Sequence, residues 1–224
     1  MLRDTRKPAR YFEEYITYQI GRIEKFEDAL RKLEKEDTAK KMQCHVYLTN
    51  FYQDLLLAKY SAGSNVDLLK KDYIKYLSHI CPQDSPTYDT ALSALSWAVL
   101  LDVRNRIILD DIHYPQDGML DAFYRYLTGT WPLDDSERLP LISPSSKPFV
   151  ESLMGEMSPD DLNHYIENDW YGSNSEAAWY ESDKLATDTY CGYWCLAGAA
   201  VVKIMQWNPC LFANNVYFPI DLLL

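Results

Sequence analysis

The strongest pattern in the sequence is YFEEYITYQIGRIEKFEDALRKL, residues 11–33. Its apolar side chains recur every three or four residues, which places them on one face of an α-helix. The opposite face carries acidic and basic side chains four residues apart, and such pairs add modest helical support. We therefore predict a long amphipathic helix with one buried face, formed by Phe12, Ile16, Ile20, Ile23, Phe26, Leu30 and Leu33.

The same helical spacing continues through the first third of the chain. Helices are expected at about 39–60 and 66–80, and Pro82 ends the second of these. Gly63, Ser64 and Asn65 separate the two, with Asn65 as a candidate N-cap. We predict that residues 1–82 form an N-terminal unit of three antiparallel helices joined by short loops.

Residues 83–224 are predicted to be helical as well, in shorter segments. Pro86 favours the start of a helix, and SALSWAVLL, residues 93–101, is apolar nearly all round, as in a central helix. Further helices are expected at about 103–112, 119–127, 148–156, 159–168 and 190–206, with a proline-containing loop over 128–147. The predicted fold class is all-α. We expect a compact antiparallel bundle of about eight to nine helices, with regions 1–82 and 83–224 packed as one body.

The charge of the chain is unevenly distributed. Its 33 acidic and 22 basic side chains give a net charge of −11. Residues 1–76 hold 15 basic and 12 acidic side chains, whereas residues 77–224 hold 7 and 21. Binding to nucleic acid or to anionic lipid needs a basic surface, so the composition argues against both as direct partners. The acidic excess serves either solubility or the attraction of a basic partner.

Segments that would direct the chain to a membrane are missing from the printed sequence. The first residues are charged, and the apolar run Tyr190–Val202 is shorter than the ~20 residues of a membrane span. The cysteines are odd in number and lack the spacing of a disulfide framework or zinc site. We expect a cytoplasmic protein with reduced, mostly buried thiols at Cys44, Cys81, Cys191, Cys195 and Cys210.

Two Asp-x-x-His pairs are the best candidates for catalytic chemistry, Asp110 with His113 and Asp161 with His164. Spaced three residues apart, each pair lies on one helix face, as in di-metal helical bundles. However, the segments are short and polar, and no glutamate on an apolar stripe supplies the missing ligands. A role in capping solvated helix ends is the alternative. The motifs of serine hydrolases, P-loops and dinucleotide-binding folds are absent from the sequence, and we expect no cofactor.

The C-terminal region carries a distinctive set of residues. These are YCGYWCLAGAA, residues 190–200, and YFPIDL, residues 217–222. Together they resemble the Y-x-G-Y-W…A-A…Y-x-P-x-D-L signature of the PoNi proteins. The likeness extends to the Trp-Tyr steps at 170–171 and 179–180, to residues 95–101 and 117–121, and to the helix at 11–33. Two departures from the family pattern are Ala197, where a glutamate is usual, and WNPC at 207–210, where an acidic turn is usual.

The resemblance implies a function, because PoNi proteins are immunity proteins against the PoNe family of bacterial DNase toxins. We therefore expect a non-enzymatic inhibitor that binds a cognate secreted toxin. A nuclease presents a basic surface to DNA, so an acidic inhibitor can compete for that surface. A metal-dependent enzyme and an adaptor that binds through exposed aromatic residues remain alternatives. The candidate contacts flank the Trp-Tyr steps and are Glu167, Asp169, Trp170, Glu176, Trp179, Glu181 and Asp183.

The signature itself is expected to stabilise the fold and not to touch the partner. Gly192 is predicted to let helices approach closely, Tyr193 and Trp194 to fill a core layer, and the alanines at 199–200 to allow tight packing. Pro219 is predicted to fix the C-terminal tail against the body of the protein.

Overall fold

The computed structural model describes residues 1–80, 82–83, 86–104, 117–134, 137–140 and 144–224. Within these ranges the secondary structure is helical, with nine α-helices and no β-strand, so the predicted all-α class is confirmed. The chain divides into two compact units. Unit 1 comprises Met1–Asp84 and Glu181–Gly192, and unit 2 comprises Ser85–Tyr180 and Tyr193–Leu224. That the two halves of the chain pack as one body stays a prediction.

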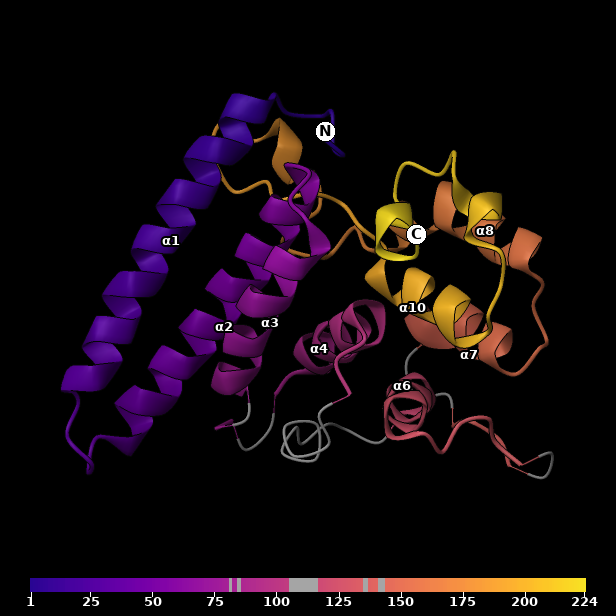
Figure 1. Ribbon diagram of the computed structural model, residues 1–224, viewed down its shortest axis with the longest axis horizontal. Helices are drawn as coiled ribbons and strands as arrows, with labels where there is room; N and C mark the ends of the chain where they lie inside the picture. Colours follow the sequence, from indigo (N-terminus) through magenta and orange to yellow (C-terminus); the bar gives the residue numbers. More distant parts are fainter. Residues whose placement is uncertain (81, 84–85, 105–116, 135–136, 141–143) are drawn as a thin grey trace. The chain divides into compact units, whose positions relative to one another are not determined.

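Unit 1 is built on three helices that lie side by side, with α2 between the other two (Figure 1). They are α1 (Ala9–Lys32), α2 (Thr38–Ser61) and α3 (Val66–Ile80). All three helices agree with the ranges predicted from periodicity. The buried residues of α2 and α3 include Leu48, Phe51, Leu69 and Tyr73.

The buried face of α1 agrees with the prediction only in part, because Phe12 and Ile23 are buried whereas Ile16, Phe26, Leu30 and Leu33 are half-buried. Ile20 is exposed, whereas Gln19 beside it is fully buried. The Gln19 amide donates hydrogen bonds to the Tyr15 hydroxyl at 2.7 Å and to Asp54 Oδ2 at 3.3 Å. A buried polar group is tolerated when its hydrogen bonds are satisfied, so this face is rotated toward Tyr15 and Gln19.

A distant segment, residues 181–192, completes unit 1 (Figure 1). It contains the short 3-10 helix η2 (Ser182–Lys184) and ends with the buried Tyr190 and Cys191. The Tyr11 hydroxyl and the Tyr190 backbone exchange two hydrogen bonds of 2.9 Å, and the Ser61 hydroxyl donates to the Cys191 carbonyl at 2.7 Å. The Tyr190 hydroxyl donates to the buried carboxylate of Asp4. These contacts fasten the segment to the ends of α1 and α2.

In unit 2, α4 (Tyr88–Leu101) is packed against α6 (Gly118–Thr128) and α10 (Leu196–Ile204). As predicted from its apolar composition, α4 is central to this unit, because every residue from Ala94 to Leu101 is buried. The prediction that Pro86 starts the helix was wrong by two residues. Thr87 is the N-cap, and its hydroxyl accepts a hydrogen bond of 3.2 Å from the backbone of Thr90.

Shorter helices complete unit 2. They are η1 (Pro144–Ser146), α7 (Lys147–Leu153), α8 (Pro159–Asn168), α9 (Trp170–Ser173), η3 (Pro209–Phe212) and η4 (Ile220–Leu222). The α8 prediction is confirmed in range and in its Ser158 N-cap. Most of the helix expected at 103–112 lies outside the described residues. No helix within the described ranges combines the length and apolarity that crossing a membrane requires.

The helix predicted at 190–206 was wrong in its first turn and a half, because α10 begins only at Leu196. Gly192 has a φ of 120°, which glycine adopts easily and other residues rarely do. Beyond it, the Cys195 N–H donates to the Tyr217 carbonyl at 2.8 Å and does not enter a helix. Gly192 therefore serves as a turn residue and not as a site of close helix approach.

Candidate functional site

The two Trp-Tyr steps form the centre of an aromatic cluster in unit 2. Trp170 and Tyr171 lie on α9, and Trp179 and Tyr180 follow in the turns behind it. The Trp170 and Trp179 rings stack with centroids 5.6 Å apart and an interplanar angle of 19°. Tyr171 and Tyr180 stack likewise at 4.6 Å. Stacked aromatic pairs add stability beyond the burial of their area, so the two Trp-Tyr steps stabilise each other.

Two tyrosines of the C-terminal signature complete this cluster. Tyr193 lies 5.0 Å from Tyr171 and 5.6 Å from Trp179, measured between ring centroids. Tyr217 stacks on Tyr171 at 5.3 Å with nearly parallel rings. Residues that are far apart in the sequence thus meet in one cluster, which fastens the irregular segment 170–180 to the residues on either side of α10.

The seven candidate contact residues are divided between the two units. Glu167, Asp169 and Glu176 are exposed on unit 2, next to the aromatic cluster. Trp170 and Trp179 belong to the cluster and are half-buried. Glu181 and Asp183 lie on unit 1, where the Glu181 carboxylate is 2.6 Å from the Lys184 ammonium. The structure therefore brings five of the seven residues together. Their role as contacts stays a prediction.

The division into units places the entire net charge of the chain on unit 2. Unit 1 carries 16 basic and 16 acidic side chains, a net charge of 0. Unit 2 carries 6 basic and 17 acidic side chains, a net charge of −11. Between Lys147 and Lys184 the sequence contains no lysine or arginine, while residues 148–180 hold seven acidic side chains. The acidic excess is thus concentrated in the region of α7, α8 and α9.

The cations of unit 2 that the structure describes are engaged by carboxylates. Arg125 pairs with Asp121 and Glu137, and the remaining described pairs are Arg104–Asp102, Arg138–Glu156, Lys147–Glu151 and Lys203–Asp102. In the part of the chain that the structure describes, no ion pair involves Glu167, Asp169 or Glu176. None of the lysines and arginines that the structure describes therefore neutralises these three side chains through an ion pair.

One exposed acid of the same region, Asp160, is missing from the predicted set. It lies seven residues before Glu167 on α8, and a separation of seven residues returns to the same helix face. The selection of acids by their distance from the Trp-Tyr steps overlooked it. The helical period of residues 159–168 carries the signal that identifies it.

The structure describes only one of the two Asp-x-x-His pairs that were candidates for catalytic chemistry. Asp110 and His113 lie outside the described residues. Asp161 takes part in a capping box, where it accepts hydrogen bonds from the Ser158 hydroxyl and backbone and its own N–H donates to the Ser158 hydroxyl. These bonds lower the pKa of Asp161. The capping alternative is thus confirmed for this residue. Among the described residues, no group of three or more potential ligands could hold a metal ion.

Unit 1 buries several titratable side chains among its helices. His45 Nδ1 and His79 Nδ1 are 3.1 Å apart, and burial lowers the pKa of His79 to about 4, with the neighbouring His45 adding to the effect. Burial raises the pKa of Asp54 to about 6, although Arg22 and the hydrogen bonds of Tyr15 and Gln19 oppose this shift. Each of these groups has an internal partner, as expected for polar contacts that support a helix core.

The described cysteines are all free, and two of them are buried in the signature segment. Burial raises the pKa of Cys195 to about 12, and it raises the pKa of Cys191 as well. Their thiols are therefore protonated and unreactive near neutral pH. Cys44 is half-buried and Cys210 is exposed, so burial holds for only part of the predicted set; Cys81 lies outside the described residues.

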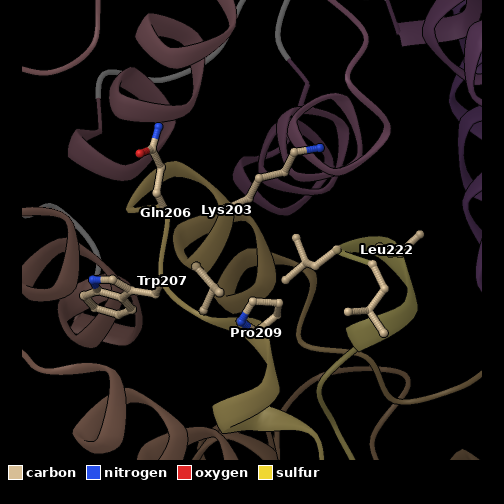
Figure 2. Close-up of a pocket in the computed structure, with 8 residues that line it drawn as sticks. Lys203, Gln206, Trp207, Pro209 and Leu222 are labelled. Atoms are coloured by element: carbon tan, nitrogen blue, oxygen red, sulfur yellow. The ribbon is translucent and has the colours of Figure 1, made fainter.

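A pocket of about 380 Å³ opens between α10 and the C-terminal residues (Figure 2). Its walls include Val202, Pro209 and Leu222, and the Lys203 side chain rises along one side. The Lys203 ammonium donates to the Leu100 carbonyl at 3.1 Å and lies 3.6 Å from Asp102, so it serves the end of α4. The pocket lining holds no histidine, cysteine or acidic side chain, and its lysine, Lys203, is already engaged at the end of α4.

Comparison with known protein families supports the resemblance to the PoNi proteins that the sequence indicates. The family model for PoNe immunity proteins (PoNi), N-terminal, matches residues 3–110, and the corresponding C-terminal model matches residues 142–222. No curated protein matches the chain. The fold is similar to the crystal structure of protein PA2201 from Pseudomonas aeruginosa, with a TM-score of 0.73 over 99% of this chain and 90% of that one, at 15% sequence identity. Since the two PoNi models together span most of its length, the chain belongs to the PoNi family of PoNe immunity proteins.

Proposed function

We propose that this chain binds a DNA-degrading toxin of the PoNe type and neutralises it by covering the toxin's basic DNA-binding surface with the acidic face of unit 2. Membership of the PoNi family supports the class of partner. The observation that carries the mechanism is the set of exposed carboxylates around α8 and α9, which form no ion pair with any cation among the described residues. This face is defined by Asp160, Glu167, Asp169 and Glu176.

The physical argument rests on the way a nuclease holds its substrate. Enzymes that act on DNA neutralise phosphates with lysine and arginine side chains, and this term dominates their affinity. Carboxylates presented by a folded protein can occupy the same cations. Opposite charges also steer the encounter, which raises the association rate at low ionic strength. An acidic inhibitor therefore reaches the nuclease quickly and competes directly with DNA.

The proposal implies that the chain acts in the bacterial cytoplasm, where the DNA substrate of such a toxin lies. It also implies that the inhibitor needs no catalytic group of its own. The aromatic cluster then has a supporting role, because it holds the segment that carries Asp169 and Glu176 in place.

The most direct experiment is co-purification with the product of the adjacent gene, followed by a nuclease assay with and without this chain. We expect a stable complex, loss of DNA cleavage at equimolar inhibitor, and an association rate that falls as salt rises. A control with excess bovine serum albumin, another acidic protein, should leave cleavage unchanged. A complex that forms without loss of cleavage would contradict the proposal, as would inhibition whose association rate does not depend on salt.

A further inference from the structure

We infer that the toxin-binding surface of unit 2 has an apolar centre, formed by Leu211 and Val216, with Asp160 and Glu167 beside it. We name this set of four residues the α8–η3 surface. The inference rests on the proposed function and extends it, because it assigns the apolar contacts of the complex to residues outside the acidic segment and outside the Trp-Tyr steps.

Hydrogen bonds fix the positions of η3 and the turn after it against α8. The Asn163 side chain donates to the Leu211 carbonyl at 3.2 Å. The Asn215 side chain in turn donates to the Asn163 carbonyl at 3.2 Å and to Asn163 Oδ1 at 2.9 Å. Leu211 and Val216 are therefore attached next to one residue of α8, Asn163.

The period of α8 places two carboxylates at the same location. Asp160 and Glu167 are three residues before and four residues after Asn163, so all three share one helix face. Both acids are exposed. Leu162 and Ile166, which lie on the adjacent side of the helix, are buried in unit 2. The acidic side chains consequently border Leu211 and Val216 along the axis of α8.

Leu211 and Val216 are exposed although their neighbours are core residues. The side chains of Leu211 and Val216 are 46% and 59% exposed. Phe212 and Phe218 are buried and stack with centroids 4.5 Å apart, which anchors the turn that presents the two aliphatic side chains. Trp170 lies 5.5 Å from Tyr217, the residue after Val216, so the aromatic cluster also supports this turn.

An apolar centre beside charged residues is the usual anatomy of a protein–protein interface. The negative charge of the α8–η3 surface indicates which kind of partner can bind there. A second copy of the chain would bring carboxylates against carboxylates, which is unfavourable, and nucleic acid carries the same sign of charge. The occupant that fits is the basic surface of the DNase toxin, with an apolar patch among its lysines and arginines.

The two kinds of residue are expected to affect different rate constants, which makes the inference testable. Apolar contacts form after the encounter and mainly slow dissociation, whereas charges mainly accelerate association. We expect Leu211→Ala/Val216→Ala to raise the dissociation rate about 30-fold, the scale of a hot-spot loss, with little change in the association rate. Asp160→Asn/Glu167→Gln should lower the association rate and its dependence on salt, with a smaller effect on dissociation.

The matched control is Leu68→Ala/Ile74→Ala on α3, which removes two aliphatic side chains that are 52% and 42% exposed on unit 1. Each variant would be measured by surface plasmon resonance against the purified, catalytically inactive toxin encoded by the adjacent gene. Circular dichroism and the melting temperature confirm that the variants are folded. Because all four aliphatic side chains are exposed, both double variants are expected to melt as the wild type does.

The outcomes separate this inference from the proposed function. If the wild-type chain does not bind the toxin, the proposed function fails. If it binds and Leu211→Ala/Val216→Ala dissociates at the wild-type rate, only the α8–η3 surface is overturned. An effect of the same size in the Leu68→Ala/Ile74→Ala control, or a changed oligomeric state with unchanged toxin affinity, would also overturn it.

Discussion

The two units of this molecule use their charged residues differently. In unit 1, basic and acidic side chains are equal in number, and several carboxylates take part in internal contacts. Asp4 pairs with Arg6 and accepts a hydrogen bond from the Tyr190 hydroxyl, and Asp54 accepts a hydrogen bond from the Gln19 amide. In unit 2, the described cations are all paired and a surplus of carboxylates remains exposed. Excess charge of one sign disfavours a compact state through self-repulsion. Folding therefore does not explain the surplus on unit 2, which serves either solubility or, as proposed above, the attraction of a basic partner.

The largest effect on stability is expected at Trp97, in the centre of unit 2. Its ring is fully buried, and its indole N–H has no hydrogen-bond partner among the described residues. Trp97→Ala should destabilise the unit by about 3–5 kcal/mol through the cavity it leaves. Trp97→Phe should cost only about 1 kcal/mol, since it also removes the unsatisfied N–H.

Hydrogen exchange followed by mass spectrometry checks this prediction segment by segment. Protection in Trp97→Ala should fall in α4, α6 and α10 and remain in α1, α2 and α3. An equal loss in both sets of helices would show that the chain unfolds as a single cooperative body, and the distinction between the units would then be one of charge alone.

A smaller effect is expected where residues 181–192 join unit 1. Tyr190→Phe removes the hydroxyl that donates to Asp4, whose carboxylate is inaccessible to solvent. Loss of a hydrogen bond to a buried charged group should cost about 1–3 kcal/mol. Urea denaturation monitored by circular dichroism measures this, with Tyr18→Phe on the exposed face of α1 as the control, for which we expect no change. Equal stability of the two variants would mean that the segment does not support unit 1.

The smallest effect concerns the dependence of stability on pH. Asp54 holds its proton more tightly in the folded than in the unfolded chain, so its contribution is present at low pH and is lost as the pH rises from about 4 to about 6. His79 has a lowered pKa, so its contribution is present at neutral pH and is lost as the pH falls from about 6.5 to about 4. The two contributions oppose each other within unit 1.

Asp54→Asn should therefore reveal the histidine contribution. We expect this variant to lose about 1–2 kcal/mol of stability between pH 7 and pH 4.5, compared with a flatter profile in the wild type. Chemical denaturation at a series of pH values measures both profiles. The prediction for unit 1 is wrong if the variant and the wild type lose stability in parallel over this range.

Much of the fold could be predicted, because most helices bury one regular apolar face. The ranges of α1, α2, α3 and α8 follow from periodicity and capping residues alone. The exchange of Ile20 for Gln19 on the buried face of α1 could not be predicted in this way. It depends on Tyr15 and Asp54 as hydrogen-bond partners, and no pattern of apolar residues reports such partners.

The start of α10 and the residues of the α8–η3 surface could not be predicted from the pattern of apolar residues either. The run from Tyr190 to Val202 is apolar throughout, so hydrophobicity cannot distinguish a buried turn from a buried helix. The positive φ of Gly192 and the bond from Cys195 to Tyr217 decide between them, and the second is a contact across 22 residues. Likewise, Leu211 and Val216 look like core residues in the sequence, and their exposure follows only from the packing of η3 on α8.

Charge reversal on each of the two units shows which unit binds the toxin. Glu167→Lys/Asp169→Lys/Glu176→Lys alters three exposed acids of unit 2, and Glu13→Lys/Glu24→Lys/Glu36→Lys alters three exposed acids of unit 1. Both triple variants change the net charge of the chain equally. At physiological salt, charges act over about 8 Å, so only those at the interface should matter. We predict that the first variant raises the toxin Kd about 100-fold or more, with an unchanged melting temperature, and that the second changes it less than about threefold. Equal losses of affinity in the two variants would contradict the assignment of toxin binding to unit 2.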